Sequence, residues 1–137
     1  MTVLRIRLQR DQEGYPPFDS EQVLGTEVAN HLFRLETTPV FAFGLACGDV
    51  VQARHFGEPQ QLWVEDLTRA GGHSTIRVIV FGDASAAGVV KEIEELGGRV
   101  EETRIRGLLA VDIAPDVDLR RLEERLIVGQ EEGRWDY

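Results

Sequence analysis

The chain has 137 residues, of which 42% are hydrophobic and 28% are charged, and its formal net charge is −9. These values are typical of a globular protein and argue against disorder. The negative charge disfavours nucleic acid as a partner, because nucleic-acid-binding surfaces are basic. The single cysteine excludes an intramolecular disulfide, and no Cys/His cluster indicates a metal or a cofactor. We find neither a signal-peptide core nor an apolar run near the ~20 residues of a membrane span, so we expect a cytoplasmic protein of bacterial type.

The first half of the chain, residues 1–74, contains short strand-like stretches separated by turn residues. Leu4, Ile6 and Leu8 alternate with polar neighbours, which predicts a half-buried strand over residues 3–9. The close spacing of these stretches predicts a small β-barrel, either SH3-like or OB-like. Further strands are predicted at residues 21–28, 31–36, 51–55 and 61–67.

A central apolar run, residues 41–51, is interrupted only by Gly48-Asp49. Apolar residues at consecutive positions favour a strand that is covered on both faces, so we expect a buried strand over 41–46. Gly48 permits the positive φ of a tight turn, and Asp49 can bond nearby backbone amides. A second strand should leave the turn at Val50.

The second half, residues 75–137, has a different pattern. After a linker of about six residues at 69–74, strands are predicted at 76–81, 99–105, 108–113 and 133–137. One helix should begin near residues 82–85, with Asp83 or Ser85 as N-cap, and end at Gly97. A second should begin at Pro115-Asp116 and end at Gly129. The β-α-β-β-α-β order predicts a ferredoxin-like split βαβ unit. The class is therefore α+β, and the short linker predicts that the halves pack together.

Four short motifs occur in a characteristic order: Asp11-x-x-Gly14-Tyr15-Pro16-Pro17, then Glu21, then Gly48-Asp49-Val50-Val51, then Gly72-His73-Ser74-Thr75-Ile76-Arg77. Together they resemble the bacterial family of unknown function called DUF4265. The resemblance extends over essentially the whole chain and is clearest at residues 3–81. It implies no activity and no cofactor.

Three groups of residues are candidates for chemistry, and each has a structural alternative. Cys47 with His73 or His55 would suit a Cys-His nucleophile, although a cysteine that continues an apolar run is more typical of a core. Residues 71–74 offer backbone amides to a small anion, or simply turn the chain. Asp19, Glu21 and Asp49 would suit acid-base chemistry or a divalent cation only if they converge.

We therefore expect no catalytic residues and a function in binding. A Pro-Pro segment loses little entropy on contact, and flanking aromatics offer large rigid surfaces. The segment could equally cover the end of the barrel.

The interpretation we favour is a protein-binding module, such as an immunity or antitoxin-like protein that neutralises a basic toxin domain. The alternative is a small-molecule site or minor enzyme in a crevice between the halves. The expected binding residues are Tyr15, Pro16, Pro17, Phe18, Asp49, His73 and Ser74, with the acidic helix at 84–96 as the substitute if Tyr15 and His73 lie far apart.

Overall fold

The computed structural model describes residues 1–82 and 86–137, and it divides into two compact units, Met1–His73 and Ser74–Tyr137. Strands and two helices are both present, and most strand pairs are antiparallel, so the predicted α+β class is confirmed. The predicted N-caps, Asp83 and Ser85, lie outside the described residues. Each unit is described by itself below.

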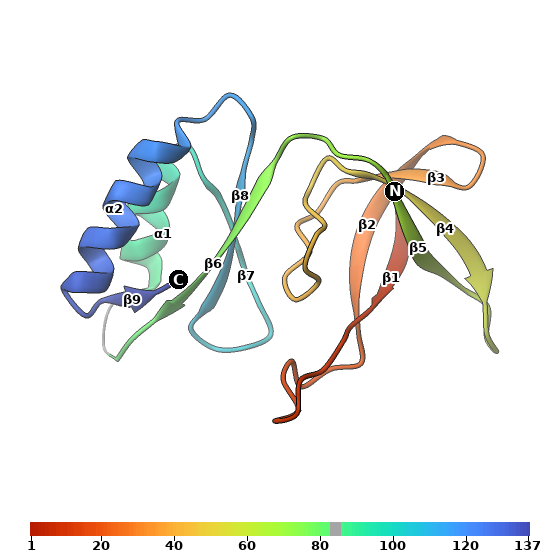
Figure 1. Ribbon diagram of the computed structural model, residues 1–137, viewed down its shortest axis with the longest axis horizontal. Coiled ribbons are helices and arrows are strands. Elements are labelled where there is room, and N and C mark those ends of the chain that lie inside the picture. The colour runs from red at the N-terminus through yellow and green to blue at the C-terminus, as the bar shows by residue number, and fades with distance from the viewer. Residues whose placement is uncertain (83–85) are drawn as a thin grey trace. The chain divides into compact units, whose positions relative to one another are not determined.

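Unit 1 is a closed barrel in which consecutive strands are hydrogen-bonded neighbours (Figure 1). Its strands are β1 (Thr2–Arg7), β2 (Ser20–Ala29), β3 (Leu32–Leu35), β4 (Val50–Phe56) and β5 (Gln61–Arg69). Neighbours from β1 to β5 pair antiparallel, and a parallel contact between β1 and β5 closes the barrel. The alternation predicted for the first strand is confirmed, because Leu4 and Ile6 are buried in the barrel core.

The predicted strand over residues 41–46 is wrong. No strand is assigned between Leu35 and Val50, although Phe41, Ala42, Ala46 and Cys47 are buried as expected. Buried amides outside a sheet need other acceptors, and two carboxylates supply them here. Glu21 accepts hydrogen bonds from the backbone N–H groups of residues 40, 41 and 42 at 2.7, 2.7 and 2.8 Å. Asp49 accepts one from residue 46 at 2.9 Å.

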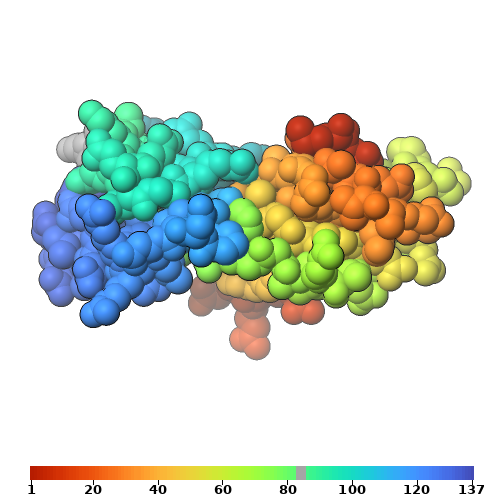
Figure 2. Space-filling model, turned by 90° about the horizontal axis from the view of Figure 1, so that it is seen from above, coloured from red at the N-terminus to blue at the C-terminus, as the bar shows by residue number. Residues whose placement is uncertain are grey.

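Unit 2 is a four-stranded sheet with the order β7-β8-β6-β9, and α1 and α2 cover one of its faces (Figure 1). The helices lie side by side, as the space-filling view also shows (Figure 2). The side chains between the helices and the sheet include Val78, Ile93, Val111, Leu122 and Trp135. The bounds are β6 (Ser74–Val80), α1 (Ala86–Glu95), β7 (Arg99–Glu102), β8 (Leu108–Ile113), α2 (Leu119–Glu131) and β9 (Trp135–Asp136).

Several predicted boundaries in unit 2 are wrong, and for three of them the structure shows the cause. β7 ends at Glu102 because the Thr103 hydroxyl accepts from the Ile105 amide and donates to the Leu108 carbonyl, which forms a turn. α2 begins after Asp118, whose carboxylate accepts from the Arg121 amide, and not at Pro115.

The end of α2 was also predicted too early. Gly129 lies inside the helix, which continues to Glu131. A Cβ on Gly129 would overlap the Trp135 indole, so this glycine is needed for close packing rather than as a helix stop.

Candidate functional site

The segment at residues 15–18 forms part of an aromatic cluster on the barrel. The Tyr15 ring lies edge-on to Phe41 with centroids 6.4 Å apart, and the Phe18 ring is tilted against Phe41 at 5.5 Å. Phe41 is itself fixed, because its amide donates to the Glu21 carboxylate. We call Tyr15, Phe18, Phe41 and Phe43 the aromatic platform. Tyr15 is 49% exposed and Phe43 is 84% exposed.

Hydrogen bonds within the preceding loop hold this segment in place. The Arg10 guanidinium donates to the carbonyls of Pro16 and Gly14 at 3.0 and 3.2 Å. The Asp11 carboxylate accepts from the Tyr15 amide at 2.9 Å. Because these bonds form within one loop of the barrel, the part of the platform on this loop, Tyr15 and Phe18, is pre-ordered within the chain itself.

A groove of about 340 Å³ adjoins the platform. Its lining combines apolar residues with the polar side chains of Arg7 and Gln9, so both apolar and polar groups of a partner could be accommodated. Phe41 and Phe43 both line the groove, and Phe41 is buried whereas Phe43 is exposed. The lining residues are Ile6, Arg7, Leu8, Gln9, Phe41, Ala42, Phe43 and Leu45.

Asp49 has a structural role. It is only 4% exposed, and its two carboxylate oxygens accept from the amides of Ala46 and Gly71, each at 2.9 Å. Gly48 has φ +87°, as the predicted turn requires, and a Cβ there would lie 2.9 Å from Cδ2 of His73. The structure therefore brings Asp49 and His73 to one corner of the barrel, joined through Gly48.

The candidate nucleophile Cys47 lies at the same corner. Its sulfur lies within 4.8 Å of an imidazole nitrogen of His73. However, the thiol is buried and donates to the Leu35 carbonyl at 3.7 Å. Burial and a backbone carbonyl acceptor are typical of a core cysteine.

The predicted binding residues therefore fall into separate groups. Tyr15 and Phe18 meet at Phe41, whereas Asp49 and His73 meet at Gly48. Ser74 is the first residue of β6, where it pairs with Ile113 of β8. The convergence of Tyr15 with His73 in one site stays a prediction.

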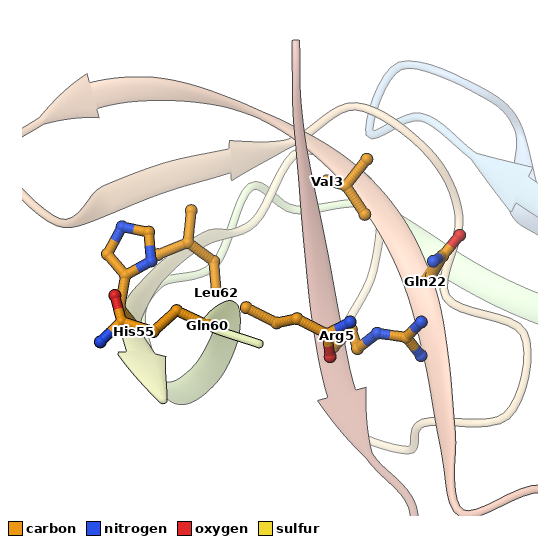
Figure 3. A pocket seen from close by; sticks show the side chains of 7 residues that line it. Val3, Arg5, Gln22, His55, Gln60 and Leu62 are labelled. Atoms are coloured by element: carbon orange, nitrogen blue, oxygen red, sulfur yellow. The ribbon is translucent and has the colours of Figure 1, made fainter. Parts of the chain in front are cut away.

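A second concave site on the barrel was not expected from the sequence (Figure 3). This barrel-wall pocket has a volume of about 310 Å³. In Figure 3, Arg5 and Gln22 come from the two neighbouring strands on one side, and His55, Gln60 and Leu62 come from the hairpin on the other. The lining residues are Val3, Arg5, Gln22, His55, Gln60, Gln61 and Leu62.

Strand register accounts for this grouping. Arg5 on β1 is directly opposite Gln22 on β2, and His55 on β4 is opposite Leu62 on β5. Arg5 points outward because its neighbours Leu4 and Ile6 point into the core. In the sequence, the outward face of the first strand was visible, but its partners across the sheet were not.

A cluster of three charged residues lies in unit 2. Arg134 and Arg125 donate to the Glu92 carboxylate at 2.6 and 2.8 Å, and both guanidinium groups lie over the Trp135 ring. The bond from Arg134 lowers the pKa of the Glu92 carboxyl, against the opposing effect of burial, and the same bond raises the pKa of Arg134. Since both arginines are used in packing the two helices on the sheet, we interpret this cluster as structural.

The comparisons with known proteins agree with this fold. A solved structure, described as the novel crystal structure of a hypothetical protein from Neisseria gonorrhoeae, matches with a TM-score of 0.80 and 23% sequence identity. The match covers 99% of this chain and 92% of that chain, and at this identity it shows the fold alone. No curated protein matches the sequence. Within the described part of the chain, neither helix has the length and apolar character needed to cross a membrane.

The family model of DUF4265, a domain of unknown function, matches residues 21–137. The Tyr15-Pro16-Pro17 motif precedes the matched residues, while Glu21, Gly48-Asp49 and Gly72-His73 lie within them. The chain belongs to the DUF4265 family.

Proposed function

We propose that this protein is a non-enzymatic, cytoplasmic protein-binding module of bacterial origin, and that its partner is a basic protein. An immunity or antitoxin-like protein that neutralises a basic toxin domain is the concrete form of this proposal. The contact surface that we propose is the aromatic platform together with its groove.

The exposure of the platform is the observation that carries the proposal. Tyr15 is 49% exposed on a loop that internal hydrogen bonds already order, and Phe43, on the segment between β3 and β4, is 84% exposed. Aromatic residues are enriched at protein interfaces, where they dominate the binding energy. A pre-ordered loop also reduces the entropy lost on association.

Charge supports a basic partner. The chain has a formal net charge of −9. Near the platform, the loop at residues 10–19 carries Asp11, Glu13 and Asp19 as exposed acids and Arg10 as its single base. Opposite charge on the partner would accelerate association and select against acidic proteins.

The fate of the candidate acids supports binding over catalysis. Glu21 and Asp49 are both buried, and together they accept five hydrogen bonds from backbone amides. Asp19 is exposed and lies 3.4 Å from Arg10 in an ion pair. Glu21 and Asp49 thus hold loop amides in place, and Asp19 forms a surface ion pair. These structural roles count against the acid-base interpretation.

We also propose a finer description of the fold. The sequential neighbours of the barrel favour an SH3-like over an OB-like arrangement for residues 1–74. The element order of residues 75–137 and the sheet order β7-β8-β6-β9 support a ferredoxin-like unit.

Site-specific photocrosslinking in the native cell tests the proposed function. A photoreactive phenylalanine analogue would replace Phe43, and a control would carry it at Ile127, which is 44% exposed on α2. We expect one basic protein to crosslink at position 43 and to form a 1:1 complex with the purified chain. Phe43→Ala should weaken that complex by at least tenfold, since hot-spot aromatics contribute about 2 kcal/mol or more. Equal crosslinking at both positions, or an acidic partner, would overturn the proposal.

A further inference from the structure

We infer that the barrel-wall pocket binds a carboxylate group attached to a short aliphatic chain. This site is distinct from the aromatic platform and does not depend on the proposed function. The carboxylate could belong to a free organic acid or to the C-terminus of a peptide, which share this chemistry.

The charge of the lining is the first reason. The chain contains 24 Asp and Glu residues and 15 Lys and Arg residues, yet among its described residues the pocket is lined by Arg5 and by no acid. A site with one fixed positive charge matches an anion with one negative charge.

The donors are the second reason. A guanidinium has five N–H donors, and Arg5 gives one terminal nitrogen to the Ser20 hydroxyl at 3.2 Å. The second terminal nitrogen is left to hold a carboxylate oxygen. The amides of Gln22, Gln60 and Gln61 add neutral donors around the same volume. These groups orient an anion without adding charge.

The apolar lining and the volume of the pocket indicate the size and character of the ligand beyond its carboxylate. Val3 and Leu62 supply the apolar part of the lining. A volume of about 310 Å³ lies at the lower end of the ~300–1,000 Å³ range of ligand pockets. The ligand is therefore small, with a few methylene or methyl groups beside its carboxylate.

Titration of the ¹⁵N-labelled full chain with butyrate, followed by NMR, tests the inference. We expect saturable shifts of the amides of Arg5, Gln22 and Gln61, with a Kd on the order of 1 mM for so small a ligand. Butyramide, which has the same shape without the charge, should bind at least tenfold more weakly. Tri-alanine and tri-alanine amide form the second pair of probes. If tri-alanine binds more tightly than butyrate, the carboxylate belongs to a peptide C-terminus. If butyrate binds more tightly, the carboxylate belongs to a free organic acid.

Variants connect binding to the pocket. Arg5→Gln should weaken butyrate at least tenfold, whereas Arg54→Gln removes a charge from β4 outside the lining and should leave the Kd unchanged. Ser20→Ala controls for the lost Ser20 bond and should retain binding. If Arg5→Gln does not fold, Gln22→Glu should abolish binding by placing an acid opposite Arg5. Equal binding of butyrate and butyramide, shifts outside the pocket, or unchanged affinity in Arg5→Gln or Gln22→Glu would overturn the inference.

Discussion

Replacement of Gly129 by alanine gives the sharpest test of the packing in unit 2, because two physical effects have opposite signs. In an exposed helix, Gly→Ala stabilises by about 1 kcal/mol through helix propensity. Gly129 is instead buried within α2, directly against the Trp135 indole. The added methyl group would overlap the six-membered part of that ring.

The indole has little freedom to move away. Trp135 is 0% exposed, and its Nε1 donates to the Leu126 carbonyl at 2.9 Å. Overpacking of this kind costs roughly 1–3 kcal/mol. We take a gross cost of about 3 kcal/mol for a ring held this firmly and subtract the propensity gain. The net loss is about 2 kcal/mol, which corresponds to a fall in Tm of roughly 5–10 °C.

Thermal unfolding followed by circular dichroism measures this loss, with Glu123→Ala as the control on an exposed position of the same helix. The control should remain within ~0.5 kcal/mol of the wild type. In a Trp135→Phe background the smaller ring leaves space, so Gly129→Ala should become neutral or stabilising. A Gly129→Ala protein that melts at or above the wild-type temperature would refute the reasoning.

The remaining predictions concern other parts of the chain. Gly48→Val should destabilise the fold by a few kcal/mol, because the site has φ +87° and a side chain there meets His73; an unchanged Tm would contradict this. Glu21→Gln should cost about 2–4 kcal/mol and accelerate hydrogen exchange of the Phe41 amide, since an amide group cannot accept all three backbone bonds; unchanged exchange would count against it. Glu92→Gln should lower the free energy of unfolding by ~1 kcal/mol relative to the wild type at neutral pH. Because Arg134 lowers the folded-state pKa of Glu92 from its ordinary 4.5, this difference should be present above pH 4.5 and vanish as the pH falls through the lowered value.

The sequence was most informative where local periodicity determines structure. The alternation of Leu4 and Ile6 with polar neighbours identified the first strand, whose inward side chains are in the barrel core. Boundaries were less predictable, because they depend on single side-chain bonds. The start of α2 followed Asp118 rather than Pro115, since only the carboxylate at 118 reaches the Arg121 amide.

The error at residues 41–46 has a specific physical cause. An apolar run reports that residues are buried, and a strand is the usual way to satisfy their amides. Here the acceptor for Phe41 is the Glu21 carboxylate, 20 positions earlier in the chain. A pattern within the run contains no information about that residue, so the burial could be predicted and the secondary structure could not.

Both candidate surfaces of unit 1 depend on the outward face of one strand. Arg5 lines the barrel-wall pocket, and Arg7 lines the groove beside the platform, with its guanidinium 4.4 Å from the Trp63 ring. The inward residues, Leu4 and Ile6, are in the core. Because side chains alternate along a strand, substitutions at outward positions can alter binding at small cost in stability, whereas those at inward positions create cavities. Binding is therefore separable from folding at Arg5 and Arg7, whereas Ile6 is a core residue that also lines the groove. A protein partner that covers Arg7 would also approach Arg5, so occupation of the groove and of the pocket should be tested together as well as apart.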